Sequence, residues 1–395
     1  MPNNWKTYKL SEALEIKYGK DHKKVQDGTI PIYGTGGIMR YGNQALYDKE
    51  TILIPRKGSL NNIFYLNEPF WSVDTIFWSK INEEVAFPKY LFYNLKVLDF
   101  ASMDVGSAIP SLTTELLKKI EIELPSLQEQ QSIASILSAI DDKIENNLAI
   151  NKTLEEMAMA LYKHWFVDFG PFQDGKFVES ELGRIPKGWE VKQLEELVDI
   201  GSSKRIFYNE YVEAGIPFYR GKEVIELSKG KSISSELFIT IEKFQEIKSK
   251  FEVPKKGDIL ISSVGTIGVS WLVDGFEDFY FKDGNLTWLK NYKTFLKGEY
   301  LHLWLNSENG KNQIDGEVIG STQKALTISS LRNFKILFPS ENVYKKIGDE
   351  FVNYYEQRQL NLIEIKTLTQ LRDTLLPKLI SGEVRLKEFK ESITN

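Results

Sequence analysis

Apolar side chains recur every three or four residues along two long stretches of the chain. The first seam consists of Ile133, Leu137, Ile140, Ile144, Asn147, Asn151, Leu154, Ala158, Leu161 and Trp165, and the second of Ile347, Phe351, Tyr354, Arg358, Asn361, Ile365, Leu368, Arg372, Leu375 and Leu379. A repeat of seven residues sustained over this length is typical of a long helix that packs along another helix. The pattern therefore predicts two long helices whose seams face each other.

Residues at the ends and in the middle of these seams refine the prediction. Ser126, followed three residues later by Glu129, is a typical helix start, and Pro377 should bend or end the second helix. Asn147 and Asn361 occupy equivalent seam positions. A buried seam asparagine fixes the register of paired helices at a cost in stability, whereas a peripheral one turns its polar end to water. The pattern leaves both interpretations open.

Shorter apolar runs, separated by Gly, Pro and Asn, precede each long helix. Residues 51–54, 75–78 and 258–261 have the composition of buried strands. Residues 88–95, which begin with a proline, and residues 298–305 have that of helices. The alternation predicts one mixed α/β region before each long helix.

The second half of the chain repeats the first. Matching residues include Trp5 and Trp189, Leu10 and Leu194, Ile32 and Phe218, Ile54 and Ile261, Leu112 and Leu326, and Asn147 and Asn361. The offset grows from 184 to 214 within the globular region and is then constant, so the additional residues of the second copy are expected in its loops. Antiparallel packing of the helices, with the two globular regions at opposite ends, is the natural arrangement.

These patterns predict an α+β fold. Two similar α/β regions are joined by two long helices that pack as an antiparallel coiled coil, with a pseudo-twofold relating the halves. The expected divisions are a first globular region at 1–124, a first long helix at 125–165, a linker at 166–188, a second globular region at 189–338, and a second long helix with a C-terminal tail at 339–395.

Composition removes several classes of chemistry. The chain has 395 residues, no cysteine and three histidines, which excludes disulfides, thiolate metal sites and a cysteine nucleophile, and leaves too few histidines for a metal cluster. No apolar run is long enough to span a membrane. We therefore expect no catalytic residue, no metal site and no membrane association, and a cytoplasmic location.

The net charge of −5 argues against a strongly basic nucleic-acid-binding surface. Residues 1–124 carry 15 basic and 15 acidic side chains, and residues 189–338 carry 20 and 21. Acidic residues outnumber basic ones 6 to 3 over 125–165. Any DNA binding by the chain alone should therefore be weak.

A duplicated globular region followed each time by a heptad helix resembles the specificity subunit of type I restriction–modification systems. The most specific similarities lie at residues 164–169 (HWFVDF), 375–384 (LLPKLISGEV) and 125–130 (PSLQEQ). Residues 339–344 (PSENVY) depart from the family's usual helix start, because they lack its paired glutamines.

The resemblance implies that each globular region recognises one half of a split, asymmetric site on double-stranded DNA. The helices would fix the spacing between the halves and dock two methylation subunits, which restriction subunits would join. S-adenosylmethionine, ATP and Mg would be held by those partners, and this chain would bind no cofactor and perform no chemistry. The alternative is a coiled-coil scaffold with two protein-binding domains and no role on DNA.

Glycine-rich loops with polar and basic side chains are the candidate DNA contacts, because they let the backbone approach a duplex and supply donors to bases and phosphates. In the first half these residues are Tyr33, Thr35, Gly36, Gly37, Arg40, Tyr41, Arg56, Lys57, Ser59 and Ser107. In the second half they are Lys204, Arg205, Tyr219, Arg220, Lys222, Ser262, Ser263, Thr266, Ser321, Thr322, Gln323 and Lys324. Because Arg220 aligns with Gly34, the two halves should recognise different sequences.

Overall fold

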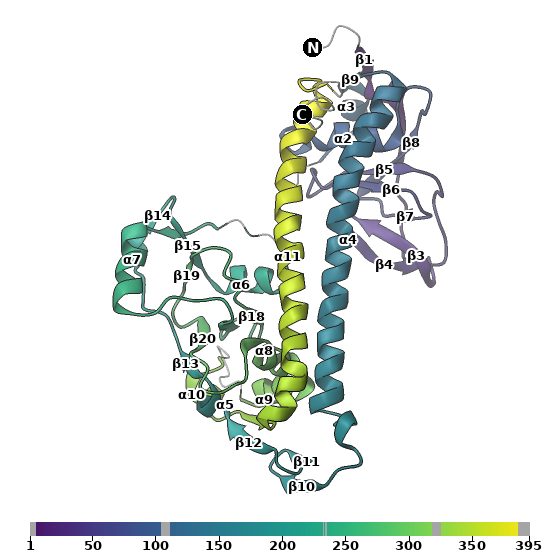
Figure 1. Ribbon diagram of the computed structural model, residues 1–395. Coiled ribbons are helices and arrows are strands. Elements are labelled where there is room, and N and C mark those ends of the chain that lie inside the picture. Colours follow the sequence, from purple (N-terminus) through teal and green to yellow (C-terminus); the bar gives the residue numbers. More distant parts are fainter. Residues whose placement is uncertain (1–4, 104–110, 232, 234, 318–324, 386–395) are drawn as a thin grey trace. The chain divides into compact units, whose positions relative to one another are not determined.

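A computed structural model describes residues 5–103, 111–231, 233, 235–317 and 325–385 (Figure 1). The chain divides into two compact units, one formed by residues 1–145 and 367–395 and the other by residues 146–366. Each long helix contributes its two ends to different units. Among the described residues, no helix combines the length and apolarity needed to cross a membrane.

The first unit is built on three small sheets. A two-stranded sheet pairs β1 (Lys6–Lys9) with β9 (Glu121–Leu124), a four-stranded sheet has the order β2 (Leu14–Tyr18), β8 (Ile76–Ile81), β5 (Thr51–Pro55) and β6 (Phe64–Leu66), and a three-stranded sheet has the order β4 (Gly37–Gly42), β3 (Asp27–Gly34) and β7 (Trp71–Ser72). Its short helices are α1 (Leu10–Ala13), α2 (Pro88–Lys96), α3 (Thr114–Lys119) and the 3-10 turn η1 (Phe100–Met103). The strands predicted at 51–54 and 75–78 and the helix predicted at 88–95 are confirmed, with ends that differ by at most three residues.

The second unit repeats this plan with additions. A two-stranded sheet pairs β12 (Glu190–Gln193) with β21 (Lys335–Phe338), and a hairpin pairs β10 (Phe177–Ser180) with β11 (Gly183–Pro186). One four-stranded sheet has the order β13 (Asp199–Gly201), β20 (Leu286–Lys290), β17 (Ile259–Ser262) and β18 (Ser270–Leu272). The other has the order β14 (Tyr211–Val212), β16 (Phe238–Ile239), β15 (Ile216–Tyr219) and β19 (Tyr280–Phe281). Its short helices are α5 (Leu194–Leu197), α6 (Gly221–Ser228), α7 (Ile241–Lys250), α8 (Gly298–Asn306), α9 (Glu308–Glu317), α10 (Ile328–Arg332), η2 (Gly170–Phe172) and η3 (Tyr208–Glu210). The predicted strand at 258–261 and helix at 298–305 are confirmed.

The duplication extends to the register of the strands. Lys6 lies opposite Leu124 in the first unit, and Glu190 lies opposite Phe338 in the second, at the offsets of 184 and 214 found in the sequence. Each unit also contains one equivalent parallel pair of strands. β3 pairs with the two-residue strand β7 in the first unit, and β15 pairs with the two-residue strand β19 in the second. Equivalent hydrogen bonds also recur, because Leu112 donates to the carbonyl of Arg56 and Leu326 to that of Ser263, each at 2.9 Å. The sequence repeat is therefore a structural repeat.

The additional residues of the second unit are not confined to loops, which corrects the expectation from the offsets. Between β15 and β17 they form α6, β16 and α7, whereas the first unit has the strand β4 after β3. The α7 segment folds as a helix because Phe244 and Ile247 bury one face and Thr240 accepts a hydrogen bond from the Lys243 amide at its start. β16 lies antiparallel to β15 as β4 does to β3, whereas α6 and α7 have no counterpart in the first half, so the repeat could not predict these two helices.

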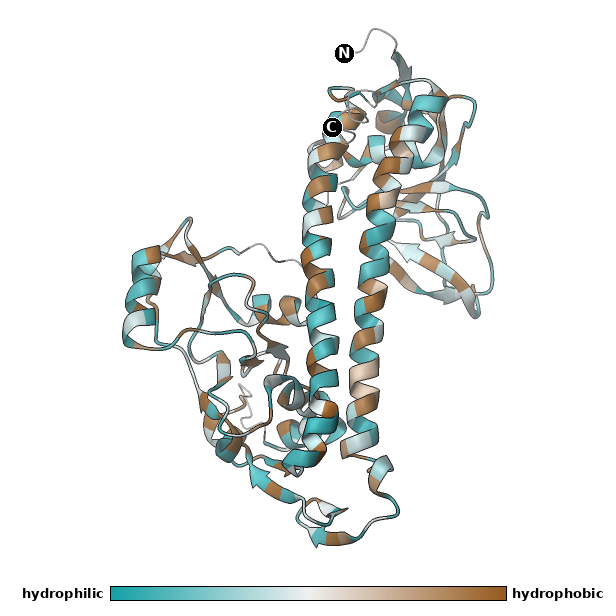
Figure 2. Cartoon of the chain, in the orientation of Figure 1, coloured by the Kyte–Doolittle hydropathy of each residue, from teal (hydrophilic) through white to brown (hydrophobic). Residues whose placement is uncertain are grey.

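The two long helices are α4 (Leu127–Phe166) and α11 (Glu341–Ile380), each of 40 residues and therefore about 60 Å long. Hydrophobic residues recur along both of them (Figure 2), and none of the predicted seam residues is exposed. Asp141 pairs with Arg372 in the first unit and Glu155 with Arg358 in the second, so residue numbers rise along one helix as they fall along the other. The predicted antiparallel pairing is confirmed within each unit (Figure 1).

Details of the helix ends and of the seam asparagines follow from hydrogen bonding. The Ser126 hydroxyl accepts a bond from the Glu129 amide at 3.3 Å, as the helix-start prediction requires. Pro377 lies inside α11, which continues to Ile380, so the proline occupies the last turn. Asn147 is 1% exposed and donates to the Glu364 carboxylate at 2.8 Å, which excludes the interpretation in which it faces water. Asn361 donates to Asn151 at 2.8 Å rather than to Asn147.

Each pair of helix segments also belongs to the core of its unit. In the first unit Ile133, Leu137 and Leu379 are buried in one cluster with Tyr90 and Leu91 of α2. In the second unit Ala158, Tyr162 and Phe351 share a cluster with Tyr300 of α8. Burial of these apolar side chains fixes each globular region on its helix segments.

Candidate nucleic-acid interface

Several predicted loops of the first unit lie together. We call residues 19–26, 34–37, 56–62 and 73–75 the first loop cluster. The Asn62 side chain donates to the Thr35 carbonyl at 2.6 Å, and the Arg56 amide donates to the Thr75 carbonyl at 2.9 Å. These bonds hold three of the loops side by side at the ends of buried strands. A rigid framework under polar loops is the arrangement that presents side chains to a ligand.

A hollow of about 590 Å³ opens within this cluster. Its lining includes the predicted Thr35 and Gly36, and also Asp21, His22 and Lys23, which the sequence analysis did not identify. The internal repeat contained the missing signal, because the equivalent loop of the second unit holds Lys204 and Arg205, which were predicted. Comparison of the two copies would have added the 19–26 loop.

Arg40 has internal partners that give it a structural role, and its predicted contact with DNA remains a prediction. Its guanidinium donates to the carbonyls of His22 at 2.7 Å and Val25 at 2.6 Å, and to the Asp27 carboxylate at 3.0 Å. Two main-chain carbonyls and one carboxylate therefore already accept hydrogen bonds from the Arg40 guanidinium. These hydrogen bonds from Arg40 hold the 19–26 loop in place, and its positive charge is partly neutralised by Asp27.

The other predicted residues of the first unit differ in accessibility. Tyr33 is 8% exposed and packs against Phe64, so its ring does not face solvent. Arg56 is half-buried, with its guanidinium carbon 5.4 Å from the centre of the Tyr18 ring. The exposed or half-buried predicted contacts are Thr35, Gly36, Gly37, Tyr41, Arg56, Lys57 and Ser59. Ser107 lies outside the described residues.

The second unit gathers its predicted loops in the same way. We call residues 202–205, 219–222, 263–266 and 282–285 the second loop cluster. The Ser203 hydroxyl donates to the Phe281 carbonyl at 2.7 Å, the Lys282 amide to the Tyr219 carbonyl at 2.8 Å, and the Ser263 amide to the Asn285 carbonyl at 2.9 Å. Sequence analysis missed the 282–285 loop, which carries no pattern that marks it as a partner of the others.

Arg220, like Arg40, is bound within the protein. Its guanidinium donates to Glu223 at 2.6 Å and to Glu236 at 2.7 Å, and Glu236 also pairs with Lys222 at 3.1 Å. Burial opposes ionisation of Glu223, yet the hydrogen bonds from Arg220 hold the pKa of that carboxyl below its usual value. Arg220 therefore fixes the start of α6, and its predicted contact with DNA remains a prediction.

Burial also separates the remaining predictions in the second unit. Tyr219, Ser262 and Ser263 are buried, and the Ser263 hydroxyl lies 2.7 Å from that of Thr287. In this conformation they support the cluster and present no side chain to a duplex. The exposed predicted contacts are Lys204, Arg205, Lys222 and Thr266. Ser321, Thr322, Gln323 and Lys324 lie outside the described residues.

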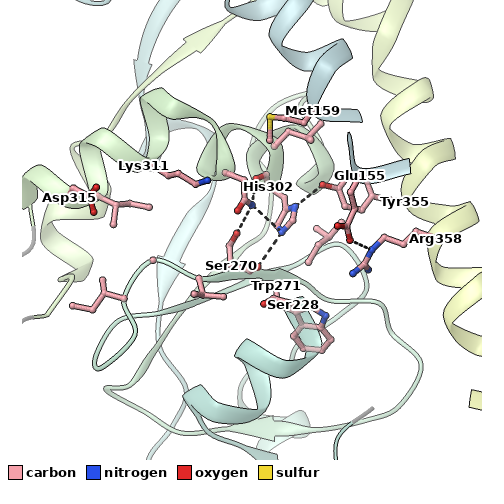
Figure 3. Close-up of a pocket in the computed structure, with 17 residues that line it drawn as sticks. Glu155, Met159, Ser228, Ser270, Trp271, His302, Lys311, Asp315, Tyr355 and Arg358 are labelled. Carbon is pink, nitrogen blue, oxygen red and sulfur yellow. Dashed lines mark hydrogen bonds and ion pairs between the residues drawn. The ribbon is translucent and has the colours of Figure 1, made fainter. Parts of the chain in front are cut away.

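A second cavity, of about 600 Å³, lies in the second unit away from the predicted contacts (Figure 3). His302 of α8 lies 2.7 Å from the Tyr355 hydroxyl of α11 and 3.3 Å from the Ser270 carbonyl. Burial lowers the pKa of His302 to about 4, so the imidazole is neutral at ordinary pH. Beside it Arg358 pairs with Glu155 of α4. The contact of His302 ties α8 to α11, and the ion pair of Arg358 ties α11 to α4.

Catalytic machinery is not evident in either cluster. Within the described ranges, no group of three or more His, Asp or Glu side chains is placed to hold a metal ion. Groups with shifted pKa values include the buried His302, buried tyrosines and residues in ion pairs that join secondary-structure elements. An example is Asp199, whose pKa is lowered by its hydrogen bond from Lys293.

Comparison with known proteins identifies the family. The model described as type I restriction modification DNA specificity domain matches residues 2–156 and 186–371. The type I restriction enzyme MjaIX specificity subunit of Methanocaldococcus jannaschii is 30% identical, over 98% of this chain and 95% of its own. A putative type I restriction enzyme specificity subunit, S.HindORF215P of Haemophilus influenzae, is 29% identical over 79% of this chain and 76% of its own.

A solved structure shares the fold. The crystal structure of the type I restriction–modification S subunit from M. genitalium aligns with a TM-score of 0.62 and 18% identity, covering 96% of this chain and 97% of that one. The family model matches twice, in agreement with the two structural repeats. The chain belongs to the family of type I restriction–modification DNA specificity subunits, whose role is the recognition of DNA sequence.

Proposed function

We propose that this chain reads a split, asymmetric DNA site, with residues 1–124 recognising one part and residues 189–338 the other. The observation that carries the proposal is the duplicated framework with unlike loops. Strand registers recur between the two units, whereas β4 follows β3 in one unit and α6 follows β15 in the other. Two equal sets of loops would read one sequence twice, so unlike loops favour two different half-sites.

The exposed side chains of the loop clusters have the chemistry that such recognition needs. Lys57, Lys204 and Lys222 are exposed cations suited to phosphate oxygens. Ser59 and Thr266 are exposed hydroxyls that can donate to or accept from base edges. Glycines at 36, 37 and 265 bring the main chain close to the loop surface. Specificity would come from the base contacts and affinity mainly from the phosphates.

The long helices would serve assembly and spacing. We propose that they dock two methylation subunits, which hold S-adenosylmethionine, and that restriction subunits with ATP and Mg join this core. Exposed apolar side chains support a docking role, since Leu148 and Met157 of α4 are each 45% exposed and Leu360 of α11 is 57% exposed. On this proposal the helices also set the length of the non-specific spacer, and no cofactor is bound by this chain.

Charge distribution predicts that DNA binding depends on these partners. Each globular region is nearly neutral, and several of its cations are already paired with carboxylates, among them Arg220 and Lys243. The chain alone should therefore bind duplex DNA weakly, and the methylation subunits should contribute much of the positive surface.

Salt dependence distinguishes this proposal from a protein scaffold without a role on DNA. Binding of random duplex DNA is measured for the complex of this chain with its methylation subunit between about 50 and 200 mM salt. The proposal expects affinity to fall steeply over this range, because phosphate binding releases counterions. Absent binding, or affinity that does not change with salt, would favour the scaffold.

A further inference from the structure

Equivalent loops of the two units have different surface chemistry. In the first unit the loop between β2 and β3 exposes Lys20, Lys23 and Lys24, and residues 19–30 contain no Phe, Tyr or Trp. In the second unit the loop after β13 exposes Lys204 and Arg205 and then Phe207 and Tyr208. Phe207 is 60% exposed and Tyr208 is 90% exposed. Two adjacent aromatic rings left in water are unusual for a packed unit.

The aromatic pair is held on a firm base. Ile206, which precedes it, is 2% exposed and is buried among Phe218, Ile239 and Tyr280. The Phe207 amide donates to the Glu210 carboxylate at 2.7 Å, and Glu210 pairs with Lys243 of α7 at 2.9 Å. The rings therefore extend from a short turn, η3, that is anchored on both sides. A rigid aromatic residue loses little conformational entropy when it binds.

The surroundings of the pair favour a polyanionic partner. Lys204 and Arg205 directly precede it, and the Lys204 ammonium lies 4.4 Å from the centre of the half-exposed Phe251 ring. Arg205 pairs with Asp283 at 2.9 Å, but the arginine side chain is 69% exposed while the aspartate is 15% exposed, so the cation faces outward. Exposed aromatic rings beside cations are the combination that binds nucleic-acid bases and their phosphates together.

The pair is continuous with the second loop cluster. The Lys204 amide donates to the Tyr280 hydroxyl at 2.7 Å, and Ser203 bonds to the Phe281 carbonyl. A duplex that contacts Lys204 and Lys222 would therefore pass close to η3. This continuity makes DNA a better-supported partner for the rings than another protein.

We infer that Phe207 and Tyr208 form an aromatic wedge that packs against a base step in the half-site read by the second unit, whereas the equivalent loop of the first unit binds phosphates through its lysines. The inference rests on the proposed function and adds to it a different mode of readout for each half. Apolar side chains inserted at a base step partly unstack it and select steps that deform easily. Part of the second half-site would thus be read through deformability.

The test uses the full chain in complex with its methylation subunit and a duplex that carries its methylated motif. Tyr208→Ala and Phe207→Ala should each weaken binding about tenfold or more without changing the slope of affinity against salt. Lys23→Ala and Lys24→Ala should weaken binding and reduce that slope by about one for each lysine. Tyr208→Phe, which retains the aromatic ring, should bind the duplex with near-wild-type affinity. All four sites are exposed, so thermal unfolding should be unchanged and serves as the control for folding.

A local probe reports the wedge itself. A 2-aminopurine base placed in turn at each step of the second half-site should brighten at one step when the wild-type complex binds and remain dark with Tyr208→Ala. If Tyr208→Ala binds DNA with wild-type affinity, the inference is overturned. If Tyr208→Ala fails to assemble with the methylation subunit, the inference is also overturned, because the rings would then contact a protein. If instead the wild-type complex shows no salt-dependent DNA binding, the proposed function itself fails.

Discussion

Several charged residues that suit DNA in the sequence are used inside the protein. Arg40 follows the glycine-rich residues 34–37 and Arg220 directly precedes Gly221, and both were expected to contact phosphates or bases. The structure gives each of them two or more internal acceptors, including the carbonyls of His22 and Val25 for Arg40 and the carboxylates of Glu223 and Glu236 for Arg220. His22 and Val25 for Arg40, and Glu236 for Arg220, lie 15 or more residues away, so local spacing could not reveal them; Glu223, three residues after Arg220, is the one local partner of the four. The structure brings most of the predicted loops together, whereas the DNA contacts of individual side chains remain predictions.

Removal of the Arg40 guanidinium should destabilise the 19–26 loop. Arg40→Ala leaves the Val25 carbonyl without its guanidinium donor and the His22 carbonyl with the Val25 amide alone, and should lower the free energy of unfolding by about 1–3 kcal/mol. Arg40→Lys should restore little of this loss, because an ammonium cannot reach the same fork of acceptors. Urea denaturation measures both. The matched control, Lys57→Ala, removes an exposed cation and should leave stability unchanged; equal stability of Arg40→Ala and wild type would show that Arg40 is free.

The buried His302 makes a specific prediction about pH. Its folded pKa of about 4 lies below the ordinary value of 6.5, so the unfolded chain takes up the proton first as the pH falls. Its contribution to stability is therefore fully present above about pH 6.5 and is lost progressively towards pH 4. The difference in unfolding free energy between wild type and His302→Gln should shrink as the pH falls through this interval, by about 1.4 kcal/mol for each pH unit. A difference that stays constant from pH 7 to pH 4 would contradict a neutral, buried imidazole.

At the scale of elements, the helix pair depends on polar partners as well as on apolar seams. Both arginines of the second seam find carboxylates on α4, since Arg372 pairs with Asp141 at 3.0 Å and Arg358 pairs with Glu155. Asp141 also accepts a hydrogen bond from Tyr93 of α2 at 2.6 Å. Sequence analysis predicted the helices well, because a heptad repeat is local and periodic. It did not predict α6 and α7, which lack both a long period and a counterpart in the first half.

A double-mutant cycle measures the coupling within this pair. Arg372→Met leaves the partly buried Asp141 carboxylate without its cation and should cost about 1–3 kcal/mol of unfolding free energy. Adding Asp141→Asn should recover part of that loss, because the unpaired charge is removed. Chemical denaturation of the four proteins gives the coupling energy. Additive effects of the two substitutions would mean that the ion pair contributes nothing specific, as is usual for exposed pairs such as Lys152 and Glu156.

At the scale of the molecule, one folding plan is used twice with different loops. The repeat was visible in the sequence because buried positions such as Ile54 and Ile261 keep their character under duplication. The divisions proposed at residues 124, 165, 188 and 338 remain predictions. The DNA sequence could not be predicted, because loop side chains reach partners that no local pattern encodes and deformable base steps add readout without direct contact. The unlike loops nevertheless predict two unlike half-sites.

The methylome of cells that express this chain with its methylation subunit tests the central claim most directly. The account predicts methylated adenines in one bipartite, asymmetric motif, whose two unlike specified parts are separated by a spacer of fixed length and free sequence. Substitution of a proposed base contact in the second loop cluster, such as Thr266→Ala, should relax the sequence of the second part alone, while Ser59→Ala should relax that of the first. A continuous or palindromic motif, or methylation without a sequence motif, would contradict recognition by two different regions of this chain.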